Sequence, residues 1–138
     1  VDGQAWTTAV WKAQYEGVQI QFNSVVYGNG RFLAAGGNPG GRGAFMTSTD
    51  GLVWSDPQPL PEPLNLDVNL AFLNGHFVAY RGNAIHLSSD NGATWNPVVL
   101  MSGGQALDVS YEGGPFQAVG WPGLRLRKPP ATWLNRTA

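Results

Sequence analysis

The sequence contains no cysteine, and this absence removes several kinds of chemistry at once. Without thiols the chain has no disulfide, no zinc–thiolate site and no cysteine nucleophile. It also lacks any run approaching the roughly 18 apolar residues that a membrane-spanning helix needs. No stretch has the charged and apolar regions of a signal peptide. The sequence therefore predicts neither thiol chemistry nor a membrane segment.

Charge is also scarce. Charged residues make up 12% of the 138 residues, and the formal net charge is −1. A protein that binds nucleic acid needs a basic face to meet phosphates, and binding to an anionic membrane needs a polybasic patch. We therefore expect neither nucleic acid nor a membrane as a partner. What the chain does have is 43% hydrophobic residues, 19 glycines and 10 prolines, which predicts one folded domain with many turns.

Three segments share one pattern, centred on Phe32, Phe77 and Phe116. Apolar residues alternate within each segment, which is typical of strands, and each segment contains an Asn-Gly or Gly-Gly pair suited to a hairpin turn. Each segment is therefore predicted to be a β-hairpin. The shared positions are an apolar residue at Val25, Leu70 and Val109, an aromatic at Tyr27, Phe72 and Tyr111, a glycine at Gly30, Gly75 and Gly114, and an alanine at Ala34, Ala79 and Ala118.

Two more strands complete each repeat. A third strand is expected at 45–47, 85–87 and 124–126, and a fourth is expected to open at Trp54, Trp95 and Trp133. Four short antiparallel strands in about 40 residues are the pattern of a β-propeller blade. We predict an all-β fold, a partial propeller with a leading strand at 1–13 and blades at 14–56, 57–98 and 99–138.

A short motif precedes the fourth strand of the first two repeats, and Asp2 to Trp6 carries a partial copy of it. The glycine supplies positive φ, the carboxylate can accept hydrogen bonds from backbone N–H groups, and the tryptophan can pack between sheets. The third repeat keeps only Trp133. The motif residues are Ser48, Asp50, Gly51 and Trp54 in the first repeat and Ser88, Asp90, Gly92 and Trp95 in the second.

These segments resemble the Asp-box, or BNR repeat, whose pattern is Ser/Thr-x-Asp-x-Gly-x-x-Trp. The second segment fits it fully, and the first lacks one residue before the glycine. Asp-boxes occur in the propellers of sialidases, some glycoside hydrolases and photosystem II assembly factors. The resemblance implies that the boxes sit on blade edges, so that Asp50 and Asp90 are structural, and it favours a secreted or periplasmic location.

Irregular sequence gathers at the other end of the predicted blades, in the stretches 36–43, 55–63, 81–83 and 120–123. Long loops on a rigid scaffold are where recognition tends to occur. We therefore predict candidate binding residues at Trp121, Arg42, Arg81 and Asn83, with the tryptophan placed in a loop as a stacking platform. No residues have metal-ligand spacing, and no cofactor or catalytic residue is predicted.

Two main functions remain open, and a third possibility is a purely assembly-directed chain, as photosystem II assembly factors are. A non-catalytic binding or scaffold module, meeting protein or carbohydrate with its loop-rich face, is favoured because the arginine cluster of a sialidase is missing and the adjacent Tyr111 and Glu112 would face opposite ways on a strand. The alternative is a sialidase-like glycoside hydrolase whose site is assembled between chains, with carboxylates drawn from Asp67, Asp108 and Glu62.

Three blades are too few to close a ring, since propellers have about four to eight. Two open apolar faces would remain. We therefore expect a homodimer of six blades, or remaining blades on another chain, with the leading strand pairing across the junction.

Overall fold

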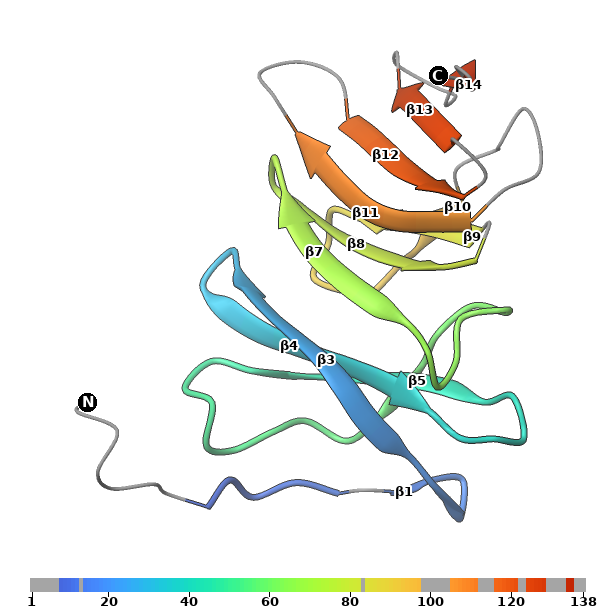
Figure 1. Ribbon diagram of the computed structural model, residues 1–138. Coiled ribbons are helices and arrows are strands. Elements are labelled where there is room, and N and C mark those ends of the chain that lie inside the picture. Colours follow the sequence, from blue (N-terminus) through green and yellow to red (C-terminus); the bar gives the residue numbers. More distant parts are fainter. Residues whose placement is uncertain are drawn as a thin grey trace.

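The computed structural model describes residues 8–12, 14–82, 84–97, 105–111, 116–121, 124–128 and 134–135 (Figure 1). The regular secondary structure of these residues is entirely β, in one small hairpin and three four-stranded antiparallel sheets. Within this part of the chain no helix is long and apolar enough to cross a membrane. The predicted all-β fold of four-stranded antiparallel sheets is confirmed.

A small hairpin leads into the first sheet, and each sheet follows chain order from one edge to the other. The hairpin is β1 (Gln14–Tyr15) and β2 (Val18–Gln19). The first sheet is β3 (Gln21–Gly28), β4 (Arg31–Gly37), β5 (Gly43–Ser48) and β6 (Gln58–Pro59). The second is β7 (Asn69–Leu73), β8 (His76–Arg81), β9 (Ala84–Ser88) and β10 (Asn96–Pro97). The third is β11 (Gln105–Tyr111), β12 (Phe116–Trp121), β13 (Leu124–Lys128) and β14 (Leu134–Asn135).

The three sheets share one strand register. In the first two strands of each sheet, Val25 pairs with Ala34, Leu70 with Ala79, and Val109 with Ala118. These are the positions that the sequence repeat aligns. The first two hairpins turn through an Asn-Gly pair in which both residues have positive φ, which glycine adopts without strain. The turn at Gly114 lies outside the described residues.

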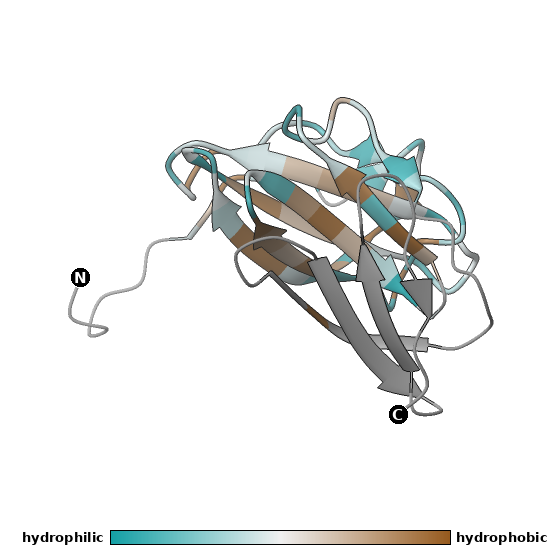
Figure 2. Ribbon diagram, turned by 90° about the horizontal axis from the view of Figure 1, so that it is seen from above, coloured by the Kyte–Doolittle hydropathy of each residue, from teal (hydrophilic) through white to brown (hydrophobic). Residues whose placement is uncertain are grey.

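The main core lies between the first and second sheets. We call the side of each sheet that carries Val25, Leu70 or Val109 its first face, and the opposite side its second face. The second face of the first sheet packs on the first face of the second sheet, as sheet stacking in a propeller requires. Figure 2 shows hydrophobic residues along the middle of these strands. The buried cluster comprises Leu33, Ala35, Phe45, Leu60, Leu64, Val68, Leu70, Phe77 and Ala79.

Two glycines let the sheets approach closely. A Cβ on Gly28 would lie 2.2 Å from the ring of Phe72, and one on Gly92 would lie 2.5 Å from the ring of Phe45. Both distances are too short for any side chain. The glycines of the first hairpin and of the second box are therefore part of the packing between the sheets, in addition to any role in turns.

The connection between the sheets is also part of the core. Leu60 and Leu64 are buried in the cluster, and the Leu60 N–H donates to the carbonyl of Gly43 at 3.1 Å. A Cβ on Gly43 would lie 2.0 Å from the Leu64 carbonyl oxygen. The connection between the sheets therefore packs against the end of the first sheet that was predicted to be rich in loops.

Some predicted strand positions are wrong. Trp54 does not open a strand: the fourth strand of the first sheet is Gln58–Pro59, beyond the predicted blade boundary at residue 56. Trp95 directly precedes β10, as expected, whereas Trp133 lies outside the described residues. Trp121 was expected in a loop, but it is the last residue of β12 and pairs with Gln105, because the ladder of the third sheet extends further than its glycines suggested.

The leading segment lies beside its own first sheet. Val10 forms a parallel bridge with Val53. Its N–H donates to the Leu52 carbonyl at 2.6 Å, and its carbonyl accepts from the Trp54 N–H at 3.1 Å. Residues 8–12 are therefore anchored on the turn that precedes Trp54.

The burial of His86 in the second sheet can be tested through the pH dependence of stability. Its ring is buried on the first face, Nδ1 has no hydrogen-bond partner, and burial lowers its pKa below 6.5. The unfolded chain therefore binds a proton first, so stability should fall as pH drops below about 6.5. His86→Met, which introduces the residue found at the same register position of the first sheet, should flatten this dependence in thermal melts between pH 7 and 5. If the melting temperatures of the two proteins fell equally as the pH was lowered, this would contradict a buried, neutral His86 ring.

Candidate functional site: the groove between the first and second sheets

The first box is a closed hydrogen-bonded turn. The Asp50 Oδ1 accepts from the N–H groups of Leu52 at 2.8 Å and Val53 at 3.0 Å. The Ser48 hydroxyl donates to that carboxylate at 3.0 Å and accepts from the Gly51 N–H at 2.8 Å. These bonds occupy the carboxylate within its own turn.

The second box repeats this arrangement with one more residue. The Ser88 hydroxyl donates to Asp90 Oδ1 at 2.8 Å and accepts from the Gly92 N–H at 2.8 Å. The Thr94 N–H donates to Asp90 Oδ1 at 2.8 Å, and its hydroxyl donates to Oδ2. Both carboxylate oxygens are thus engaged.

The tryptophans of the two boxes differ in their hydrogen bonds. Trp54 Nε1 donates to the Gly51 carbonyl at 3.1 Å. Trp95 Nε1 is buried and has no hydrogen-bond partner. The Trp95 ring instead packs edge-on against Phe45, with centroids 5.7 Å apart and planes at 73°. It therefore joins the core between the sheets.

The lowered pKa values of the two box carboxylates agree with closed, hydrogen-bonded turns. Hydrogen bonds from the backbone of Val53 and Leu52 lower the pKa of Asp50 below its usual 3.8. Hydrogen bonds from the side chain and backbone of Thr94 lower the pKa of Asp90 to about 2. A catalytic acid needs a pKa near the operating pH, so these shifts run opposite to that requirement.

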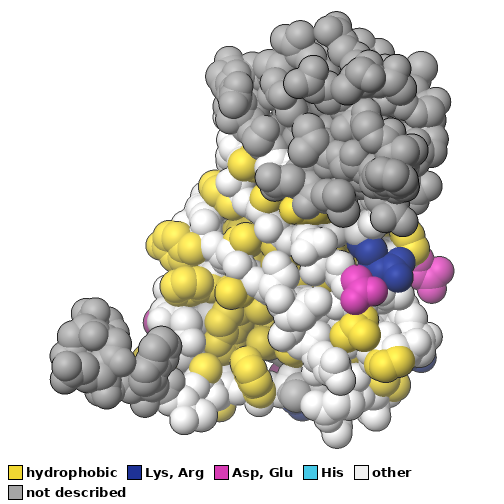
Figure 3. All heavy atoms as spheres, viewed as in Figure 1, with side chains coloured by type: hydrophobic (Ala, Val, Ile, Leu, Met, Phe, Trp, Pro, Cys, Tyr) yellow, Lys and Arg dark blue, Asp and Glu magenta, His cyan; other side chains and the backbone are white. Residues whose placement is uncertain are grey.

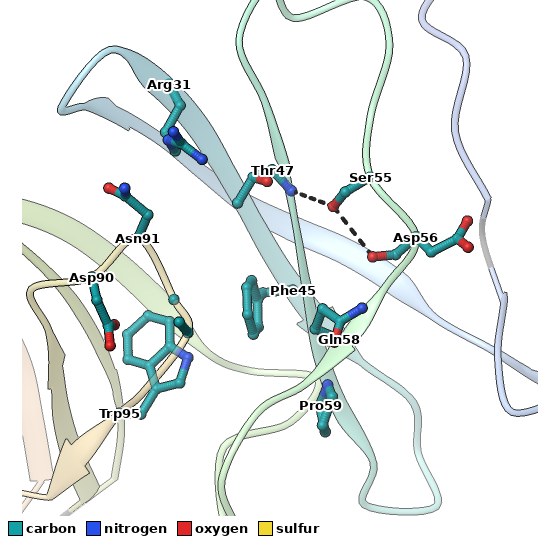
Figure 4. A pocket seen from close by; sticks show the side chains of 12 residues that line it. Arg31, Phe45, Thr47, Ser55, Asp56, Gln58, Pro59, Asp90, Asn91 and Trp95 are labelled. Atoms are coloured by element: carbon teal, nitrogen blue, oxygen red, sulfur yellow. Dashed lines mark hydrogen bonds between the residues drawn. The ribbon is translucent and has the colours of Figure 1, made fainter.

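A groove of about 490 Å³ separates the second box from the outer edge of the first sheet. Phe45 and Trp95 are the aromatic residues of its lining (Figure 4). Donor and acceptor side chains surround them, so the groove offers both kinds of contact to a ligand. The lining is completed by Arg31, Thr47, Ser55, Asp56, Gln58, Pro59, Asp90, Asn91, Gly92 and Ala93.

Arg31 is the charged donor at one end of this groove. It begins β4, directly after the first hairpin turn, and its side chain reaches between Asn91 and Thr47 (Figure 4). The turn itself is tied to the second box, because the Asn29 amide donates to Asn91 Oδ1 at 2.6 Å. Among the described residues, Arg31 forms no ion pair.

The predicted binding arginines are paired within the chain. Arg42 lies in the loop between β4 and β5 and forms an ion pair with Glu16. Arg81, the last residue of β8, lies 3.8 Å from an Asp67 carboxylate oxygen. Asn83 and the side chain of Trp121 lie outside the described residues. The structure thus does not bring these four residues together into one described site.

The carboxylates considered for hydrolysis do not form a described pair either. Asp67 is engaged by Arg81, Glu62 is exposed in the connection between sheets, and only the backbone of Asp108 is described, in β11. In the described part of the chain, no group of three or more histidine and acidic residues could hold a metal ion.

Sequence reasoning missed the groove and Arg31. The predicted binding residues all lie at the loop-rich end, whereas Arg31 begins β4 at the end that carries the boxes, where only structural roles were expected. The available signal was the glycine at position 28, which allows the first hairpin to lie against the second sheet and brings the turn to the second box.

Comparisons with known proteins support the fold. No protein-family model matches the sequence, and no curated protein sequence matches it. A solved structure described as YCF48 bound to D1 peptide matches with a TM-score of 0.60 and 24% identity, covering 98% of this chain and 46% of that one. The GH43 endo-arabinanase from Bacillus licheniformis matches with a TM-score of 0.51 and 16% identity, covering 94% and 57%. The chain therefore has a propeller-like β fold and spans about half the length of these proteins.

The second box should carry acid-dependent stability. Since the pKa of Asp90 is about 2 when folded and 3.8 is its ordinary value, its contribution is complete above about pH 4 and is lost as pH falls toward 2. Asp90→Asn should lower the melting temperature at neutral pH and reduce the loss below pH 4. Hydrogen bonds also lower the pKa of Asp50, so some loss should remain. Asp56→Asn, at an exposed site outside the boxes, is the control, and an equal effect of the two substitutions would contradict the closed turn.

Proposed function

We propose that this chain is a non-catalytic binding module that takes an extended peptide segment of another protein in the groove between its first and second sheets. The observation that carries the proposal is Arg31, a cation without a described ion pair, at the end of a groove that combines an aromatic floor with polar walls. A guanidinium in such a position suits a carboxylate, which it can bind through two parallel hydrogen bonds.

The chemistry of the groove favours a peptide. Trp95, which is half-buried, offers apolar surface to a side chain beside the largely buried Phe45, while Gln58, Asn91 and Thr47 offer donors and acceptors to a main chain. The likeness to YCF48 bound to D1 peptide adds support, since that protein of similar fold is described with a peptide. The engaged carboxylates of both boxes support a non-catalytic role.

Binding to an array of ten-residue peptides, followed by fluorescence anisotropy on the best binders, tests this function. We expect acidic peptides to be enriched. Arg31→Gln should weaken their binding about tenfold, or about 1.4 kcal/mol, because it removes one charge-assisted contact. Arg42→Gln, which removes the same charge at the other end of the first sheet, should leave the affinity unchanged.

Binding and activity assays on further variants distinguish the competing hypotheses. A loss confined to Arg42 and Arg81 variants would place recognition at the loop-rich end. Binding to a glycan array without peptide binding would favour a carbohydrate ligand. Turnover of a chromogenic glycoside, abolished by Asp67→Asn or Asp108→Asn, would favour the hydrolase and contradict the proposal.

A further inference from the structure

One position of the repeat differs sharply in exposure among the three sheets. Leu70 is 9% exposed and Val109 is 7% exposed, whereas Val25, at the same register position of the first sheet, is 58% exposed. The second and third sheets each follow another sheet along the chain. The first sheet has no sheet before it in the described residues, and its first face is open.

The neighbouring positions follow the same rule. Phe77 is 1% exposed on the first face of the second sheet, and Phe72 packs against the core there. Their counterparts in the first sheet are Phe32, which is half-buried, and Tyr27, which is 59% exposed. Their rings contact each other at 4.7 Å between centroids. The first sheet therefore presents the aromatic surface that the second sheet buries.

The large exposed hydrophobic side chains of the described residues all belong to this region. Figure 3 shows such side chains over the first sheet. A shallow groove of about 330 Å³ lies on this face, lined in part by Trp11, Phe22, Met46 and Trp54. A contiguous apolar surface of this kind marks an interaction site. The large exposed residues are Val10, Trp11, Val25, Tyr27, Leu52 and Val53.

The leading segment indicates what belongs there. Asp2 to Trp6 repeats the sequence pattern of Asp50 to Trp54, so Val10 corresponds in spacing to Gln58, which is in the fourth strand of the first sheet. Gln58 lies across the groove from the second box. Val10 lies beside the first box in direct contact, bridged to Val53, whereas the groove separates Gln58 from the second box. Spacing and neighbouring box together point to residues 8–12 as the fourth strand of a sheet preceding the first.

We propose that the first face of the first sheet is the docking surface for one further antiparallel sheet of three strands, supplied by polypeptide outside residues 1–138, with residues 8–12 of this chain as its fourth strand. The chemistry of the docked face is that of Val26, Leu33, Ala35 and Phe45, the small, aliphatic and aromatic side chains that the second sheet meets at its own first face.

A second copy of the chain fits this surface less well. The third sheet of a second copy already has a fourth strand, β14. Docking it here would bring two segments, β14 and residues 8–12, to one strand position. A three-stranded sheet leaves that position to the leading segment alone. The expected homodimer of six blades is therefore the competing outcome of the test.

The experiment uses residues 1–138 and an extended form of them. In the extended form, a second copy of residues 14–49 stands directly before Asp2, which rebuilds a complete box from Ser48, Thr49, Asp2, Gly3 and Trp6. Because the protein has no cysteine, Val25→Cys in the original sheet introduces the sole thiol of either protein. The rate at which this thiol reacts with a maleimide reports whether the first face is covered.

The proposal predicts a reactive thiol in the unextended chain, sedimenting near 14.8 kDa, and a rate on the order of tenfold slower in the extended chain. The extended chain should also melt at a higher temperature. Ser89→Cys, exposed in the second box, is the control and should react equally in both proteins. As a second variant, Tyr27→Asp in the original sheet should lower the melting temperature much more in the extended chain, where the new charge would be buried.

Three results would overturn the proposal. One is a Val25→Cys thiol whose reaction rate does not change on extension. Another is an extended chain that is unfolded or melts no higher than the original. The last is a Val25→Cys thiol that is already protected in the unextended chain together with a doubled mass, since a second copy would then cover the face.

Discussion

Everything described in this chain depends on one contact, the packing of the second face of the first sheet on the first face of the second. Neither sheet is large enough to bury both of its faces alone, so each uses its neighbour as its core. Leu33 and Phe77 are almost completely buried at this contact. The close approach also requires Gly28 and Gly92, because a side chain at either position would collide with an aromatic ring from the facing sheet.

The same contact creates the groove and explains the open face. Stacking brings the first hairpin, with Arg31, against the second box and leaves the groove along the outer edge of the first sheet. Repeating the contact buries Leu70 and Val109 in successive sheets. Omitting it leaves Val25 exposed on the first sheet. The groove and the open face thus follow from one packing rule, which operates for the second and third sheets, where a preceding sheet is present, and not for the first.

The sequence predicted the repeat well because its signals are local. Alternating apolar residues and Asn-Gly turns, as at Asn29 and Asn74, determine hairpins within a few residues. The fourth strand was predicted to begin at Trp54, whereas it begins at Gln58. The sequence gives little local signal for β6, because this strand has only two residues and its pairing partners, Ala44 and Phe45, lie well before it in the chain. The groove was missed for a related reason: Arg31 and Trp95 are far apart in sequence, and only the stacking of sheets brings them to one site.

The most direct test of this packing is a double-mutant cycle between Phe45 and Trp95, whose rings meet across the two sheets at 5.7 Å. The free energy of unfolding would be measured for the chain, for Phe45→Leu, for Trp95→Leu and for the double variant. Stacked sheets predict a coupling energy of about 0.5–1.5 kcal/mol, the range of aromatic pairs in contact. Additivity within about 0.3 kcal/mol would show that the two rings do not meet and would contradict the account.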